Sequence, residues 1–211
     1  MIFAAGLGTR MGALTASTPK PMLSFNGRHL IDYCLDFLQN AGITKIVANT
    51  HYLPEELEAH LSNKGVITSR EDVLLETGGG LKAALPLLGD GPVITINPDV
   101  LWHGPNPVTA ILEAWRPDMT ALLMVCEAGH EESDFRLYEG ELQRNGPFRY
   151  TGLQVIRPEG LSDIEQQVFS LNRFWDRILS RGALHGSVYK GNWQDVGTEA
   201  DFHAANARYS S

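Results

Sequence analysis

A glycine-rich segment with two cations nearby is the first part of the sequence that could do chemistry. Residues 4–12 read AAGLGTRMG and follow a short apolar run. Glycine at positions 6 and 8 lets backbone N–H groups approach a ligand closely, and successive N–H groups can cradle phosphate oxygens. Arg10 adds a planar cation suited to phosphate, and Lys20, between two prolines, adds a second. The pattern indicates phosphate binding, although an ordinary turn with a surface Arg and Lys has the same composition.

Two common nucleotide motifs do not describe this segment. A dinucleotide fingerprint needs G-x-G-x-x-G opening a helix, but the third glycine is displaced and no helix is expected through residues 15–21. The sequence also lacks the string G-x-x-x-x-G-K-[ST], which marks another type of phosphate-binding loop. An oxidoreductase that binds a nicotinamide cofactor is therefore disfavoured.

Two carboxylates follow strand-like segments farther along the chain. Asp99 ends the string NPD after an apolar run, and Asp195 lies in WQDVGT. A carboxylate at the carboxyl end of a parallel strand points into the usual ligand crevice, and one or two carboxylates with phosphate oxygens suit Mg²⁺. The alternatives are an Asp in a proline-containing turn for Asp99 and a turn that caps the last helix for Asp195.

A second glycine run, ETGGG at residues 76–80, precedes a predicted helix. Three glycines let a flat or charged ligand lie on the backbone, and a helix N-terminus favours an anion. A flexible turn before a helix is the alternative interpretation.

Together these strings resemble the signature of the sugar-1-phosphate nucleotidylyltransferases, which make nucleotide sugars. The resemblance rests on A-A-G-x-G-x-R-M, P-K-P, Asp99 and W-x-D-x-G-T, and it covers nearly the whole chain. The string LETGGG is similar to that of the short uridylyltransferases that act on N-acetylmuramate 1-phosphate in cell-wall recycling. It also resembles some mannose-1-phosphate guanylyltransferases.

The resemblance implies a role for each matched residue. Arg10 would hold the leaving pyrophosphate, Lys20 would stabilise charge near the α-phosphate, and Asp99 with Asp195 would hold Mg²⁺. These four form the expected catalytic set. The residues expected to bind the nucleotide are Ala4, Ala5, Gly6, Gly8, Thr9, Arg10, Lys20, Glu71, Thr77 and Gly78.

The sugar pocket is expected farther along the chain, at Asp134, Phe135, Arg136, Thr151 and Gly152. Strand surface and core are the alternatives for these positions. Two departures from the family pattern affect this region. Pro98 replaces a small residue before Asp99, and a Glu-Lys-Pro motif whose lysine holds the sugar phosphate is missing. Arg136 or Lys190 could take that place.

Alternating elements must position these groups. Apolar patterns predict strands at 2–5, 45–49, 66–68, 93–97 and 121–126, and helices at 29–39, 54–61, 80–88 and 107–115. After residue 130 we expect antiparallel strands at 135–138, 141–144 and 148–156, then a helix at 171–179, a strand at 184–189 and a helix at 198–207. This order predicts an α/β fold with a mostly parallel central sheet, helices on both faces and a small antiparallel C-terminal part. The resemblance implies a Rossmann-like nucleotide-diphospho-sugar transferase fold.

Length and composition fit one domain over residues 1–211. We expect a nucleotide-binding part at about 1–125 and a sugar-binding part at about 126–211. The chain has 211 residues, 17 Lys+Arg, 25 Asp+Glu and a net charge of −8, and 43% of its residues are hydrophobic. This composition excludes a disordered chain and argues against a nucleic-acid binder. No apolar run reaches the ~18 residues of a membrane span, and the start lacks a basic region, so we expect a cytoplasmic protein with two reduced cysteines.

The sequence therefore predicts a Mg²⁺-dependent enzyme that joins UTP and a sugar 1-phosphate into a UDP-sugar and pyrophosphate. The preferred sugar, by resemblance, is N-acetylmuramate 1-phosphate. The alternatives are GTP with mannose 1-phosphate, CTP with another phosphorylated alcohol, and a nucleotide-sugar sensor without catalytic activity. The oligomeric state is left open.

Overall fold

The structure, a computed structural model, describes residues 1–129 and 133–209. Its centre is a nine-stranded sheet in the order β5-β4-β1-β6-β11-β8-β12-β10-β9. Along that order the strands are β5 (Ile67–Arg70), β4 (Val47–Thr50), β1 (Ile2–Phe3), β6 (Val93–Ile96), β11 (Phe148–Ile156), β8 (Ala121–Glu127), β12 (Leu184–Val188), β10 (Glu141–Gly146) and β9 (Ser133–Tyr138).

One half of the sheet is parallel. Strands β5, β4, β1 and β6 pair in parallel, and β4 and β6 are buried along their whole length. Parallel strands need crossover connections, which α1 (Leu30–Asn40), α2 (Pro54–Ser62) and α3 (Glu76–Leu88) supply. The expected parallel sheet is therefore found where helices alternate with strands.

The other half is mixed. Strand β11 lies antiparallel between β6 and β8, while β12 pairs in parallel with β8. Strands β10 and β9 form an antiparallel hairpin at the far edge. Antiparallel pairing thus reaches the middle of the sheet, because the long strand β11 inserts there from the C-terminal third of the chain.

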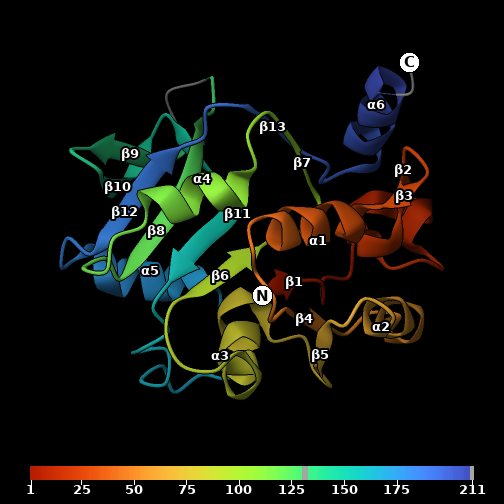
Figure 1. Ribbon diagram of the computed structural model, residues 1–211, viewed down its shortest axis with the longest axis horizontal. Helices are drawn as coiled ribbons and strands as arrows, with labels where there is room; N and C mark the ends of the chain where they lie inside the picture. Colours follow the sequence, from red (N-terminus) through yellow and green to blue (C-terminus); the bar gives the residue numbers. More distant parts are fainter. Residues whose placement is uncertain (130–132, 210–211) are drawn as a thin grey trace.

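Helices cover both faces, which confirms the predicted α/β class. Side chains of α1, α2 and α4 (Pro107–Ala114) share one apolar core, and those of α3 and α5 (Leu171–Leu179) share a second. Figure 1 shows α1 and α4 on the near side of the sheet. No helix of the described residues is long and apolar enough to cross a membrane.

Several short elements were not predicted. Two 3₁₀ helices, η1 (Thr9–Thr15) and η2 (Lys20–Met22), follow the first strand, and β2 (Ser24–Phe25) pairs with β3 (Arg28–His29). A separate ribbon joins β7 (Val100–His103) to β13 (Asn192–Asp195), and α6 (Glu199–Tyr209) packs against η1 in a third apolar cluster. The expected helix at 80–88 begins earlier, at Glu76, so it includes all three glycines of the second run.

Candidate active site

Four charged residues that are distant in the sequence come together beside the first strand. The Lys20 Nζ atom lies 2.6 Å from Asp99 Oδ2. Asp195 lies within electrostatic reach of Asp99, Lys20 and Arg10. The cluster therefore contains every residue of the expected catalytic set.

The β7–β13 ribbon sets the spacing of the two carboxylates. Asp99 precedes β7, and Asp195 ends β13 opposite Val100. The Val196 N–H donates to the Asp99 carbonyl over 3.0 Å, which extends the ladder by one more contact. The antiparallel register thus places Asp99 and Asp195, which are 96 positions apart in the sequence, on adjoining backbone segments.

The electrostatics of the cluster favour a bound cation. Burial raises the pKa of the Asp195 carboxyl, the negative charge of Asp99 raises it further, and Lys20 and Arg10 lower it. Lys20 itself is only 8% exposed. A half-buried carboxylate whose nearest acidic neighbour carries the same charge gains from a cation between the two.

In the first glycine loop, there is free space beside Gly6 but not beside Gly8. A Cβ at Gly6 would meet no atom within 4 Å, whereas a Cβ at Gly8 would lie 3.0 Å from Thr15 Cγ2. Gly8 also has a φ of +64°, a left-handed conformation that glycine adopts without strain. Gly6 therefore leaves space for a ligand, and Gly8 permits the turn that places the loop.

Buried polar groups hold the start of this loop. The Ala4 N–H donates to Asn49 Oδ1 over 2.9 Å, and Asn49 Nδ2 donates to Glu71 Oε1 over 2.7 Å. The second Glu71 oxygen accepts the Leu75 N–H over 2.9 Å. Glu71, expected to bind the nucleotide, is thus 5% exposed with both oxygens engaged by the protein.

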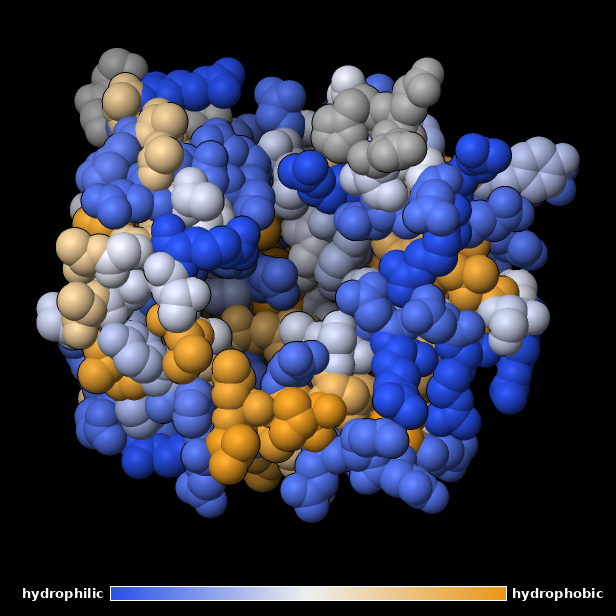
Figure 2. Space-filling model, turned by 180° about the vertical axis from the view of Figure 1, so that it is seen from behind, coloured by the Kyte–Doolittle hydropathy of each residue, from blue (hydrophilic) through white to orange (hydrophobic). Residues whose placement is uncertain are grey.

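Two adjoining cavities of about 350 Å³ each meet at Gly6 and Asp99. The first is lined by the glycine loop and the cations, and the second extends toward α3 and the start of α5. Of the residues expected to bind nucleotide, the first cavity exposes Ala4, Gly6, Gly8, Thr9, Arg10 and Lys20. The second exposes Ala5, Gly6 and Thr77, while Glu71 and Gly78 line neither. Figure 2 shows a hollow near the middle of the rear face, with hydrophilic residues to its left and right and pale to hydrophobic residues below it.

The second glycine run, at residues 78–80, is in close contact with other parts of the chain. The N–H groups of Gly78 and Gly79 both donate to the Phe169 carbonyl, over 2.9 and 3.0 Å. A Cβ at Gly79 would lie 2.1 Å from the Gln167 carbonyl oxygen, and one at Gly80 would lie 2.6 Å from Glu71 Oε1. These glycines allow the segment at residues 167–169 to approach α3, and they do not offer an open backbone to a ligand as expected.

Three of the residues expected around the sugar are core or backbone-bonding residues. Phe135 and Thr151 are both 0% exposed, and Thr151 Oγ1 donates to the Met124 carbonyl. The prediction that these two contact a sugar is wrong in this structure, because no ligand can reach them. Asp134 accepts the Tyr150 N–H over 2.9 Å.

The other expected sugar residues have different positions. Gly152 approaches the end of β6, where its carbonyl accepts the Asn97 N–H over 3.0 Å. Arg136 and Lys190 are exposed, and neither lines the two cavities.

Sequence reasoning missed several residues of these cavities, among them Phe3, Asn49, Leu74 and Ser170. Asn49 had a usable signal, because it is a polar residue near the carboxyl end of a buried strand. Ser170 had none, since its position depends on how the C-terminal segments fold back, whereas Gly197 belongs to the W-x-D-x-G-T string.

A divalent cation fits the Asp99 and Asp195 pair by donor chemistry. Mg²⁺ is commonly held by one or two carboxylates together with phosphate oxygens. The described residues contain no group of three or more His, Cys, Asp or Glu side chains arranged as a metal site.

Comparison with known proteins identifies the family. Residues 1–178 match the family described as "MobA-like NTP transferase domain". The chain belongs to this family.

Curated relatives of this NTP transferase cover its whole length. It is 37% identical to the N-acetylmuramate alpha-1-phosphate uridylyltransferase of Caulobacter vibrioides, over 99% of the chain and 95% of that protein. It is 32% identical to the enzyme of the same name from Neisseria meningitidis, over 98% and 96%. It is 28% identical to a mannose-1-phosphate guanyltransferase of Aspergillus fumigatus, over 99% of the chain and 63% of that protein. The chain is therefore an enzyme of the nucleotidyltransferase class.

Solved structures share the fold. HddC from Yersinia pseudotuberculosis, crystallised with GMP-PN, superposes with a TM-score of 0.81 at 19% identity and covers 99% of this chain and 97% of its own. The inositol-1-phosphate CTP transferase from T. maritima gives a TM-score of 0.80 at 19% identity, over 98% and 94%. The NTP transferase thus has the nucleotidyltransferase fold that the sequence predicts.

Proposed function

We propose that this NTP transferase transfers a uridylyl group from UTP to a sugar 1-phosphate, with N-acetylmuramate 1-phosphate as the sugar substrate. The observation that carries the reaction type is the cluster of two carboxylates and two cations beside the open Gly6 cavity. The two relatives above 30% identity, both named as N-acetylmuramate 1-phosphate uridylyltransferases, support the choice of substrates.

The reaction balances without a general base. An oxygen of the sugar phosphate forms a bond to the α-phosphorus of UTP, and the bond from that phosphorus to the bridging oxygen breaks. Pyrophosphate leaves with the electron pair, and the UDP-sugar remains. A phosphate monoester is already ionised near neutral pH, so no side chain has to remove a proton. Positioning and charge stabilisation are what the protein must supply.

The first loop would bind the triphosphate. Gly6, Leu7 and Gly8 line the first cavity, and a Cβ at Gly6 would meet no atom within 4 Å, so their backbone N–H groups could approach phosphate oxygens. Arg10 is exposed at the same cavity and is free to close over the β- and γ-phosphates. A guanidinium suits this task because its planar fork can contact two phosphate oxygens at once.

Lys20 would act nearer the reacting phosphorus. The backbone of η2 holds it, and its ammonium lies 2.6 Å from Asp99 Oδ2. When a phosphate enters, the lysine can exchange part of this contact for the α-phosphate oxygens, where charge develops in the transition state. Asp99 and Asp195 would hold Mg²⁺, which supplies charge neutralisation between the nucleotide and the sugar phosphate when bound.

Pyrophosphate release tests the proposal. The enzyme would be assayed with Mg²⁺ and each of the common nucleoside triphosphates, combined with a panel of sugar 1-phosphates that includes N-acetylmuramate 1-phosphate. We expect release with UTP and N-acetylmuramate 1-phosphate, and none from the Asp99→Asn variant.

Other results would change the assignment. Release only with GTP and mannose 1-phosphate would replace both substrates with those named for the Aspergillus relative. Silence across the panel with intact UTP binding would overturn the enzymatic proposal in favour of a sensor.

A further inference from the structure

A third cavity, of about 280 Å³, lies apart from the two at the glycine loop and shares no lining residue with them. The end of β11, the C-terminal half of α5 and the turn around Gly160 enclose it. Its lining includes three arginines, Arg157, Arg177 and Arg181, and two carboxylates, Glu159 and Asp163. Three cations at one small cavity are unusual in a chain whose net charge is −8.

The charges of these arginines are poorly compensated. Arg157 donates to the Pro117 carbonyl over 2.9 Å, which satisfies one N–H but carries no negative charge. The Arg181 guanidinium has no ion pair or hydrogen bond within the part of the chain that the structure describes. Arg177 lies 3.8 Å from Asp163, and both side chains are well exposed, so this ion pair is weak.

We propose that this cavity is a second binding site, specific for a small phosphate monoester. Three guanidiniums against the two carboxylates leave the cavity with a net positive charge, which suits a phosphate monoester because that group carries about −1.5 to −2 charges at neutral pH. With a volume of about 280 Å³, the cavity has room for a sugar phosphate. Thr120 and Glu159 provide oxygens for its hydroxyl groups, and the ring of Phe174 provides an apolar wall.

The site is connected to the active site by two elements. Ser170, which caps α5, lines the second active-site cavity, and Arg177 on the same helix lines the arginine cavity. Strand β11 contains Gly152, beside Asn97 of the active site, and ends just before Arg157. A ligand at the arginine cavity therefore contacts the far ends of elements that shape the active site.

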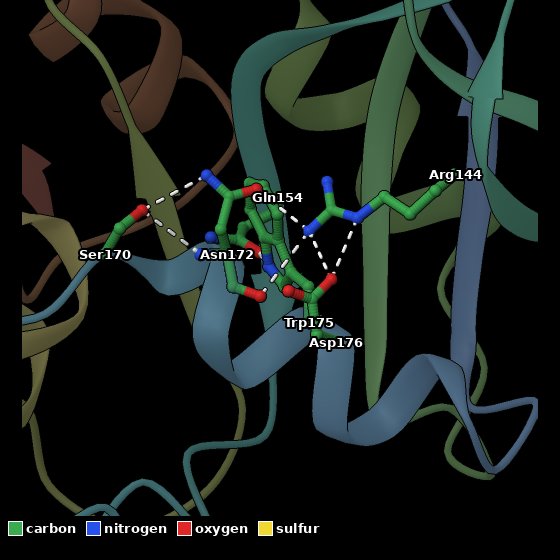
Figure 3. A network of polar contacts seen from close by, with 6 residues as sticks. All are labelled: Arg144, Gln154, Ser170, Asn172, Trp175 and Asp176. Carbon is green, nitrogen blue, oxygen red and sulfur yellow. Dashed lines mark hydrogen bonds and ion pairs between the residues drawn. The ribbon is translucent and has the colours of Figure 1, made fainter.

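Polar contacts hold α5 firmly to the sheet, as Figure 3 shows. Trp175 Nε1 donates to Gln154 Oε1 of β11 over 2.9 Å, and Gln154 Nε2 donates to Thr95 of β6 over 3.0 Å. Arg144 of β10 donates to Asp176 and to the Asn172 side chain, each over 2.9 Å or less. These contacts anchor α5 between Asn172 and Asp176, so this helix is the element through which a ligand at Arg177 would act on Ser170. We therefore assign the site a regulatory effect on nucleotide binding.

Calorimetric titration of the whole chain with glucose 6-phosphate tests the binding. This ester is chosen because its phosphate is not on the anomeric carbon, so it is no substrate for the proposed reaction. We expect Arg177→Gln and Arg181→Gln each to weaken binding at least tenfold, and Asp163→Asn to tighten it because Arg177 loses its competing partner. Arg149→Gln, which removes the same charge from the opposite end of β11, is the control and should change the affinity less than twofold.

Three results would overturn the site: no binding by the wild type, equal affinity in all variants, or loss of binding in Arg10→Gln alone. The last result would place the ester in the active-site cavity. Inorganic phosphate should bind more weakly than the ester, and equal affinity would contradict a site for the whole ester.

Kinetics tests the regulatory effect separately. Saturating glucose 6-phosphate should change KM for the nucleotide at least threefold in the wild type and not in Arg177→Gln. An unchanged KM in the wild type, with binding intact, would overturn the coupling. Because calorimetry does not depend on turnover, its test of glucose 6-phosphate binding remains valid even if the proposed enzymatic function fails.

Discussion

The two glycine-rich segments of this chain have similar sequences and opposite structural roles. The loop around Gly6 leaves empty space at the mouth of a cavity, and a Cβ there would meet nothing within 4 Å. The run at 78–80 is filled by neighbouring chain, with two of its N–H groups bonded to the Phe169 carbonyl. A glycine can therefore admit either a ligand or another part of the same protein, and its sequence context does not distinguish the two.

The comparison extends to the charged residues. Arg10, Lys20, Asp99 and Asp195 gather at the open loop, whereas the polar residue beside the closed run, Glu71, has both oxygens occupied by protein donors. Chemistry is thus expected at the first segment and structural support at the second.

The largest effect should follow from neutralising a carboxylate at the open loop. Asp195→Asn should reduce kcat on the order of a thousandfold, because the charge that holds a cation against the phosphates is lost. Single-turnover kinetics with UTP and a sugar 1-phosphate would measure it, with circular dichroism as the control for folding. Wild-type turnover would remove Asp195 from the mechanism.

A side chain added within the packed glycine run should lower the stability of the fold. Gly79→Ala places a methyl group 2.1 Å from the Gln167 carbonyl oxygen, which is backbone and cannot rotate away. We expect the free energy of unfolding to fall by about 3 kcal/mol, although alanine is the better helix former. Denaturant unfolding would measure this fall, and the kcat of the remaining folded enzyme should stay near that of the wild type. Equal stability would show that residues 167–169 do not pack on this helix in solution.

The matching substitution at Gly6 should weaken nucleotide binding and leave stability almost unchanged. Gly6→Ala should leave stability within about 0.5 kcal/mol, because its methyl group enters empty space. It should raise KM for the nucleotide roughly tenfold, since the methyl group occupies part of the proposed triphosphate site. Initial-rate kinetics and thermal unfolding on the same preparation would decide it. A stability loss with unchanged KM would show that Gly6, like Gly79, serves packing rather than ligand binding.

The smallest expected effect concerns stability and pH. The pKa of Asp195 is raised above its ordinary value of 3.8, chiefly by burial and then by Asp99. A carboxyl group whose folded-state pKa is raised destabilises the fold above that pKa, and the penalty disappears as pH falls below 3.8. Asp195→Asn should therefore melt at a higher temperature than the wild type at pH 7, and the difference should close as the pH falls toward 4. A lower melting temperature for the variant at pH 7 would contradict this assignment.

The sequence by itself determined the order of elements and the charged residues of the site. Alternating apolar strands and helices of the N-terminal part follow from local periodicity, and the structure contains them close to the expected bounds. Arg10 follows a glycine turn and Asp99 follows a predicted strand, whereas Lys20 and Asp195 were assigned through the family strings P-K-P and W-x-D-x-G-T.

Only the tertiary structure decided which positions are open. Phe135 and Thr151 lie on strands whose periodicity leaves either face available, and the packing of α5 and β11 buries them. Gly78 and Gly79 are closed by residues 167–169, almost ninety positions later in the chain, and Gly80 is closed by Glu71 and Asn49. Local sequence reports the conformation a segment can adopt, but burial depends on contacts between distant segments, and these exist only in the folded chain.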